Sequence, residues 1–262
     1  MKSKGIAFPY VGWMAIFVVA PLLIIVFYAF QAKTGGFTLE NFSHMLEYTN
    51  VFARSFLLAI LATVICLVIG YPVAYWLSRE GPGVRRAAMM LVMLPMWMNF
   101  LLRTYSWMFL LERRGLINSL LGLFGLGPFQ MINTQGAIVL GMVYNFLPFM
   151  ILPILSVLEK IDPKVVEAAQ DLGANSVTVF RRVIFPLSLP GVLSGVTMVF
   201  IPSVSTFAIS RLLGDLIEMQ FMGTAYNPYL GSAIALVMMV IVLVCMAVMN
   251  RFGAGEEGVS ML

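Results

Sequence analysis

The sequence predicts an all-α integral membrane protein with six spanning helices. Of its 262 residues, 61% are hydrophobic and only 11% are charged, whereas soluble domains carry roughly 25% charged residues. The mean hydropathy is +0.95, and the apolar residues fall into long runs separated by short polar segments. A soluble core cannot bury this much apolar surface, so we expect the chain to lie in a lipid bilayer. The basic residues lie mostly on the loops between the apolar runs, so we expect no binding of nucleic acid.

Each predicted span is close to the length that crosses the hydrocarbon layer, about 20 residues. The six candidates are 9–31, 54–78, 87–111, 136–158, 185–210 and 231–250. The first run follows two lysines and lacks a small-residue cleavage site, which favours a retained span over a signal peptide. No composition shift or repeat divides the chain, so we expect one transmembrane domain over 1–262.

The distribution of basic residues predicts the orientation, because cytoplasmic loops of membrane proteins carry an excess of Lys and Arg. With the N-terminus inside, ten basic residues fall on the inner side: Lys2, Lys4, Arg79, Arg85, Arg86, Lys160, Lys164, Arg181, Arg182 and Arg251. Five fall outside: Lys33, Arg54, Arg113, Arg114 and Arg211. We therefore expect both termini, and the long polar loop at 159–186, to be cytoplasmic.

The loop at 159–186 is predicted to form two short helices that meet at a bend. Asp162 is a good N-cap and Pro163 suits the first helical turn. Gly173 can adopt a positive φ and end this helix, and a second helix is expected from Asn175 or Ser176 to Arg182. The stripe of small and apolar residues between the two ends is Val165, Val166, Ala168, Ala169 and Leu172.

This loop resembles the EAA loop of bacterial ABC importer permeases. Glu167-Ala168-Ala169 is followed after three residues by Gly173, and nine residues later by Val183-Ile184-Phe185-Pro186, where the family has Ile-x-Leu-Pro. The resemblance implies a type I importer fold in which the loop docks into a separate ATPase subunit. The implied contact residues are Glu167, Ala168, Ala169, Asp171 and Gly173. The alternative is an ordinary amphipathic connector between two spans.

Other runs resemble the polyamine permeases of the PotB and PotH type. They are the opening at 12–30, IGYPVAYWLS at 69–78, LPMWMNFLLRTYSW at 94–107, NSLLG at 118–122 and VYNFLPFMILPILSVLEKID at 143–162. The resemblance implies import of spermidine or putrescine across the bacterial inner membrane. The implied partners are a PotC-like second permease, two PotA-like ATPases that bind ATP and Mg, and a PotD-like binding protein. Permeases for opines, phosphonates, iron and thiamine share parts of these runs, so another cargo stays open.

Polar side chains within or beside the spans are the candidate pathway residues, because such groups are costly in lipid and are often functional. They are Trp97, Asn99, Arg103, Tyr105, Tyr144, Asn145, Ser203, Ser205, Thr206, Asp215 and Glu218. Aromatic faces and oxygen atoms suit a polycation, and the carboxylates lie at the outer edge. We expect Asp215 and Glu218 to attract the cation or to dock the binding protein.

Several of these groups have a structural alternative. Ser203, Ser205 and Thr206 are of the type that serves helix packing, and Trp97 and Tyr105 are of the type that anchors spans at the interface. Asp215 and Glu218 can be plain loop charges. Arg103 can extend to the interface or pair with a partner's carboxylate; an exposed Arg103 would favour an anionic cargo.

Two other classes of protein have little support. A membrane-embedded enzyme would need a nucleophile with a base, or metal ligands, but the single histidine, His44, stands in an outer loop and no catalytic or metal-binding motif is found. A secondary transporter would need an ion site inside the membrane, and no carboxylate lies there. The sequence contains no GxxxxGK[ST] phosphate loop, so we expect no cofactor on this chain and ATP hydrolysis in a partner.

Overall fold

The computed structural model describes residues 8–33, 35–132, 134–205, 213–223 and 226–253. Within these ranges all regular elements are helices, and the one extended pairing is an isolated bridge between Gln31 and Phe37. The all-α prediction is confirmed. Five helical stretches are long and apolar enough to cross a membrane: Pro9–Ala29, Glu40–Arg79, Gln135–Leu158, Ser176–Ser205 and Pro228–Met249.

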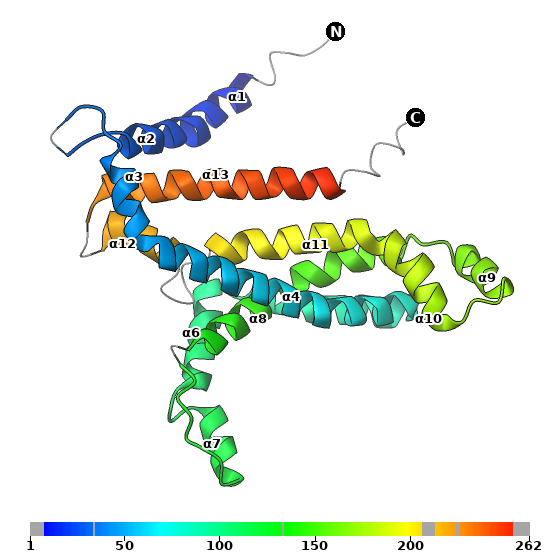
Figure 1. Ribbon diagram of the computed structural model, residues 1–262. Helices are drawn as coiled ribbons and strands as arrows, with labels where there is room; N and C mark the ends of the chain where they lie inside the picture. Colours follow the sequence, from blue (N-terminus) through cyan, green and yellow to red (C-terminus); the bar gives the residue numbers. More distant parts are fainter. Residues whose placement is uncertain (1–7, 34, 133, 206–212, 224–225, 254–262) are drawn as a thin grey trace.

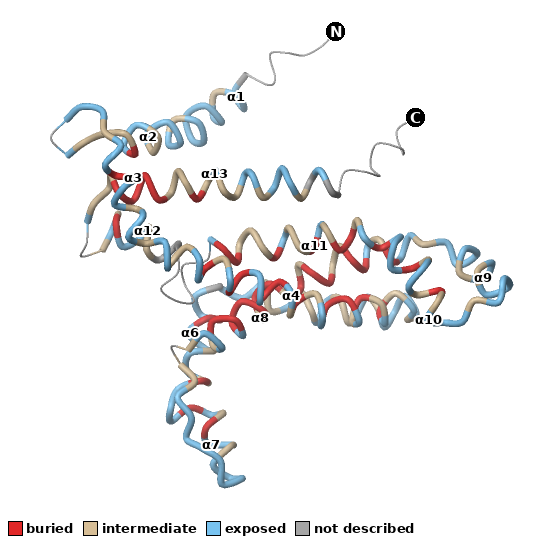
Figure 2. Tube along the Cα trace, in the orientation of Figure 1, coloured by how far each residue is buried: buried red, intermediate tan, exposed pale blue. Residues whose placement is uncertain are grey.

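Three long helices form the centre of the molecule: α4 (Thr49–Arg79), α8 (Gln135–Leu158) and α11 (Phe185–Ser205). They run side by side (Figure 1), and the buried residues are concentrated on them (Figure 2). The main core is built from aliphatic and thioether side chains such as Leu58, Met142, Met150, Ile154 and Val199. A Cβ added to Gly191 on α11 would lie 2.8 Å from the carbonyl oxygen of Pro153. Glycine is therefore required there for α8 and α11 to approach so closely.

The first and last spans lie beside this centre (Figure 1). The helices α1 (Phe8–Met14), η1 (Ala15–Val19) and α2 (Ala20–Ala29) make up the first span, and α2 packs along α13 (Pro228–Gly253). The rings of Tyr28 and Tyr229 meet with centroids 5.6 Å apart. The short helices α3 (Glu40–Met45) and η2 (Leu46–Tyr48) lead into α4, and α12 (Leu213–Met222) precedes α13. A second, smaller core around Ala59, Val204 and Ile234 packs α4, α11 and α13 together.

The predicted third span, 87–111, is not one straight helix. The chain forms α5 (Pro82–Met93) and η3 (Leu94–Trp97), then turns by 92° into α6 (Phe100–Leu111) and α7 (Leu116–Leu123). Pro95 lies in the 3-10 turn, and the side-chain oxygen of Asn99 caps α6 by accepting from the backbone N–H groups of Leu101 and Leu102 at 2.9 and 3.4 Å. A proline followed by an Asn cap ends one helix and starts another. The six-span count therefore holds only if the broken pair is one span, and α6 and α7 point away from the bundle (Figure 1).

Candidate functional site

A helical hairpin at the end of the bundle contains the EAA-like residues (Figure 1). We call it the coupling hairpin after the role that the resemblance implies, and it consists of α9 (Pro163–Asp171), α10 (Ser176–Val179) and η4 (Phe180–Ile184). Asp162 caps α9, since its Oδ1 accepts from the backbone N–H of Lys164 at 3.0 Å, and Pro163 occupies the first turn. Both ends of this helix lie where the sequence predicted them.

The bend of the coupling hairpin is fixed by backbone hydrogen bonds. Gly173 has φ +82°, and its N–H donates to the carbonyl of Gln170 at 2.8 Å. The N–H of Ala174 donates to the carbonyl of Ala169 at 3.1 Å. This pair of bonds is the Schellman arrangement, which favours glycine at the left-handed position. Asn175 then caps α10 by accepting from the N–H of Thr178 at 2.8 Å, and η4 continues directly into α11.

The two faces of α9 have different environments. Val166 and Ala169 are half-buried against the main core, whereas the other predicted contact residues, Glu167, Ala168, Asp171 and Gly173, are exposed. The predicted apolar stripe is therefore divided between the faces. Leu172, which the sequence placed in that stripe, is 89% exposed at the tip of the hairpin. An exposed leucine beside a carboxylate and small residues is suited to contact another protein.

A hydrogen bond between side chains holds the base of the hairpin to α4. The hydroxyls of Tyr71 and Ser188 lie 2.8 Å apart, and Ser188 Oγ donates to the carbonyl of Phe185 at 2.9 Å, so Tyr71 is the donor. The ring of Phe180 lies edge-on to Tyr71 and Tyr75, with centroids 5.8 and 5.4 Å apart. No pattern in the sequence indicates these contacts, because the residues are distant in the chain.

Two of the predicted pathway clusters meet where α6 packs on α8. Arg103 Nη1 donates to the carbonyl oxygen of Pro95 at 2.7 Å, and its guanidinium lies 6.0 Å from the ring centroid of Tyr144. Trp107 packs edge-on against the same ring, with centroids 5.2 Å apart. Arg103 is only 8% exposed, and its bond to Pro95 connects α6 to η3 on the other side of the break in the third span. It does not present the exposed cation that would favour an anionic cargo.

The remaining pathway candidates do not converge on one site. Asn145 is buried and donates to the carbonyl of Gly141 at 2.8 Å, and buried Ser203 donates to that of Val199 at 2.6 Å. Both bonds run to the preceding turn of the same helix, so neither side chain is directed to a pathway within this chain. The candidates with exposed side chains are Trp97, Asn99, Tyr105, Ser205 and Glu218. Thr206 lies outside the described residues, and Asp215 lies on α12 with its side chain outside them.

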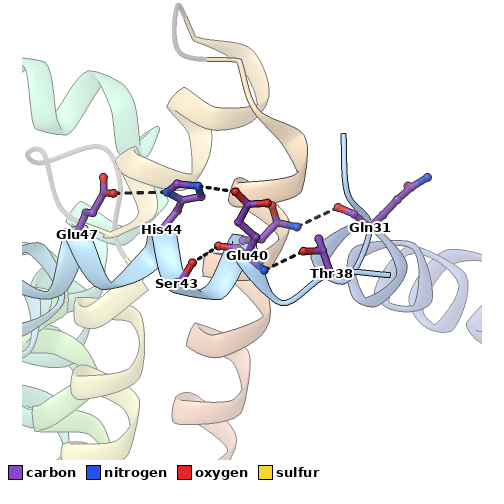
Figure 3. A network of polar contacts seen from close by, with 7 residues as sticks. Gln31, Thr38, Glu40, Ser43, His44 and Glu47 are labelled. Atoms are coloured by element: carbon purple, nitrogen blue, oxygen red, sulfur yellow. Dashed lines mark hydrogen bonds and ion pairs between the residues drawn. The ribbon is translucent and has the colours of Figure 1, made fainter. Parts of the chain in front are cut away.

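Acidic side chains gather on α3 and η2, and these helices lie far from the coupling hairpin (Figure 1). His44 lies between Glu40 and Glu47, with nitrogen–oxygen distances of 3.6 and 3.5 Å, and all three are exposed (Figure 3). These carboxylates were not among the predicted candidates. Within the described part of the chain, no group of three or more His, Cys, Asp or Glu residues could hold a metal ion.

The fold and hairpin define a multi-pass helical membrane protein with an EAA-type loop at one end. The chain matches the family described as "Binding-protein-dependent transport system inner membrane component" over residues 67–254, and it belongs to that family. It is therefore a permease of an ABC importer and a multi-pass protein of the inner membrane.

Relatives and solved structures agree with this assignment. The chain is 35% identical over 258 residues to the spermidine/putrescine transport system permease protein PotB of Haemophilus influenzae, covering 92% of this chain and 90% of that protein. The fold is similar to that of a bacterial ABC transporter involved in the import of the acidic polysaccharide alginate (TM-score 0.82, 16% identity, 96% and 94% coverage). It is also similar to the MetNI methionine ABC transporter (TM-score 0.63, 18% identity, 81% and 97% coverage).

Proposed function

We propose that this chain forms half of the translocation pathway of an ATP-driven polyamine importer and couples to a separate ATPase through the coupling hairpin. The observation that carries the coupling role is the hairpin itself. Glu167, Ala168 and Leu172 form an exposed surface, and a Schellman turn and the main core hold them in place. A rigid projection can transmit a push from a partner, whereas a flexible loop would absorb it.

The polyamine cargo is supported by the name of the relative that matches over nine-tenths of this chain. Exposed Glu40, Glu47 and Glu218 at the end away from the hairpin would attract a polycation before it enters. Tight recognition would then belong to the binding protein, and weak contacts along the pathway would let the cargo leave.

The proposed assembly has four kinds of part: this chain, a PotC-like permease, two PotA-like ATPases that bind ATP and Mg, and a PotD-like binding protein. Hydrolysis takes place in the ATPases. The end of α13 lies on the same side of the bundle as the coupling hairpin (Figure 1). This arrangement supports a cytoplasmic position for that end together with the hairpin.

The deciding experiment is uptake of labelled spermidine and putrescine by a host that lacks its own polyamine importers. The host expresses this chain with its neighbouring genes, with and without an intact ATPase. We expect uptake that requires both the ATPase and this chain. If an assembled complex takes up neither spermidine nor putrescine, polyamines are excluded as the cargo. Opines, phosphonates, iron and thiamine would then be tested.

A further inference from the structure

One arginine joins the ends of three helices next to the coupling hairpin. Arg85, on α5, donates from Nε to the carbonyl of Leu77 at 3.3 Å, and from Nη2 to those of Ser78 and Glu80 at 3.4 and 2.9 Å. Its Nη1 lies 3.2 Å from Oε1 of Glu159. The last carbonyls of a helix have no donor within the helix and favour a nearby cation. Arg85 therefore closes the end of α4 and binds the end of α8 with one guanidinium.

Glu159 occupies the joint between α8 and the hairpin. It is the C-cap residue of α8, and Asp162, three residues later, is the N-cap of α9. The turn between them is tight, since the N–H of Lys160 donates to the carbonyl of Val157 at 3.0 Å. The side chains of Arg85 and Glu159 are 29% and 34% exposed, so water shields this ion pair only partly.

We propose that Arg85 and Glu159 are positioning residues for coupling, and that their ion pair prevents α9 from pivoting about the joint. The inference rests on the proposed coupling function of the hairpin. Without the pair, the joint would be held to the bundle by fewer contacts, and part of a displacement applied to α9 would be lost as rotation at residues 159–162. With it, the displacement reaches the ends of α4 and α5 as well as α8.

The neighbouring residue provides a matched control. Arg86 carries the same charge on the same helix, is exposed, and makes no side-chain hydrogen bond or ion pair within the described residues. Arg86→Gln therefore removes the same charge from the same region without opening the joint. Glu159→Gln is the second test variant, because it breaks the ion pair and leaves the carbonyl contacts of Arg85 in place.

The first measurement is cargo transported per ATP hydrolysed, with the complete complex in proteoliposomes. We expect Arg85→Gln and Glu159→Gln to retain the ATPase and its basal hydrolysis while the ratio falls about fivefold or more, the lower range of measured coupling between sites. The double variant should be no worse than the more severe single variant, because Arg85→Gln already removes the ion pair that Glu159→Gln breaks. Arg86→Gln should behave as the unmodified chain.

The second measurement does not depend on the cargo. Spin labels at Gly83→Cys on α5, where an added side chain meets no atom within 4 Å, and at exposed Gln170→Cys on α9 report the distance across the joint. The background lacks Cys66 and Cys245. We expect a broader distance distribution in Arg85→Gln and Glu159→Gln than in Arg86→Gln, in the assembled complex, even if spermidine proves to be the wrong cargo.

Two results would overturn the inference. One is that both test variants match Arg86→Gln in transport ratio and in distance distribution. The other is that Arg85→Gln releases the ATPase while Glu159→Gln is normal, which would assign Arg85 to direct contact with the ATPase.

Discussion

The hydroxyl of Tyr71 on α4 lies 2.8 Å from the hydroxyl of Ser188 on α11, across 117 positions of sequence. Both residues are buried, and the hydroxyl of Ser188 donates a hydrogen bond to the carbonyl oxygen of Phe185. The contact ties the start of α11, into which the coupling hairpin continues, to the neighbouring span. Few other polar contacts between side chains join distant elements in the described part of the chain.

Replacing Tyr71 by Phe should destabilise the chain by about 0.6 kcal/mol, the average for hydrogen bonds between membrane helices. The loss should be small because Ser188 keeps its bond to Phe185. Equilibrium unfolding in mixed micelles measures it. Tyr75→Phe is the control, since that ring packs on Phe180 without a hydroxyl contact in the described residues. Equal stability of the two variants would contradict the prediction.

Replacing Gly191 by Leu should force α8 and α11 apart, because even a Cβ would approach the carbonyl oxygen of Pro153 to 2.8 Å. Overpacking of this kind costs about 1–3 kcal/mol. The same unfolding assay should show the loss. Gly122→Leu on α7, where an added Cβ meets nothing within 4 Å, should leave stability nearly unchanged. A Gly191→Leu chain as stable as that control would show that the helices pack less closely than described.

Replacing Gly173 by Pro should uncouple ATP hydrolysis from uptake while the chain stays in the membrane. Proline fixes φ near −65°, far from +82°, and removes the N–H that donates to Gln170. Glu167→Lys should have the same effect by reversing an exposed charge. Gly173→Asn, which tolerates the left-handed conformation, should retain uptake. Normal uptake by both Gly173→Pro and Glu167→Lys would remove the coupling role of the hairpin.

Neutralising Asp215 and Glu218 together, as Asn and Gln, should slow polyamine uptake at low ionic strength. Salt screens charges over about 8 Å at 0.15 M, so the difference from the unmodified chain should shrink as salt is added. Initial uptake rates across a salt series test this, and the high-salt point serves as the internal control. If the variant and the unmodified chain have equal uptake rates at every ionic strength, Asp215 and Glu218 are loop charges without a role in uptake.

The features that could be predicted are those set by local chemistry. Asp162, Pro163, Gly173 and Asn175 specify the coupling hairpin through caps and a positive φ, which depend only on nearby backbone. The third span was predicted as one run because hydropathy averages over a window and does not register the Asn99 cap beside Pro95.

The contacts between distant residues could not be predicted in the same way. Tyr71 with Ser188, and Arg85 with Glu159, depend on how whole helices pack. Asn145 and Ser203 resemble pathway residues in the sequence, but the structure buries them inside the chain. A span that is apolar on all sides has no periodic pattern to separate its buried face from its outer face.

The half-buried face of α9 packs against the main core, to which α4, α8 and α11 contribute, and close-packed interiors compress very little. On the coupling role proposed above, a displacement of the hairpin would therefore move the three spans with it, as a lever whose short arm is the hairpin. With 31 residues, α4 is about 46 Å long at 1.5 Å per residue. A small tilt imposed at the short arm would thus be amplified into a much wider sweep at the opposite end.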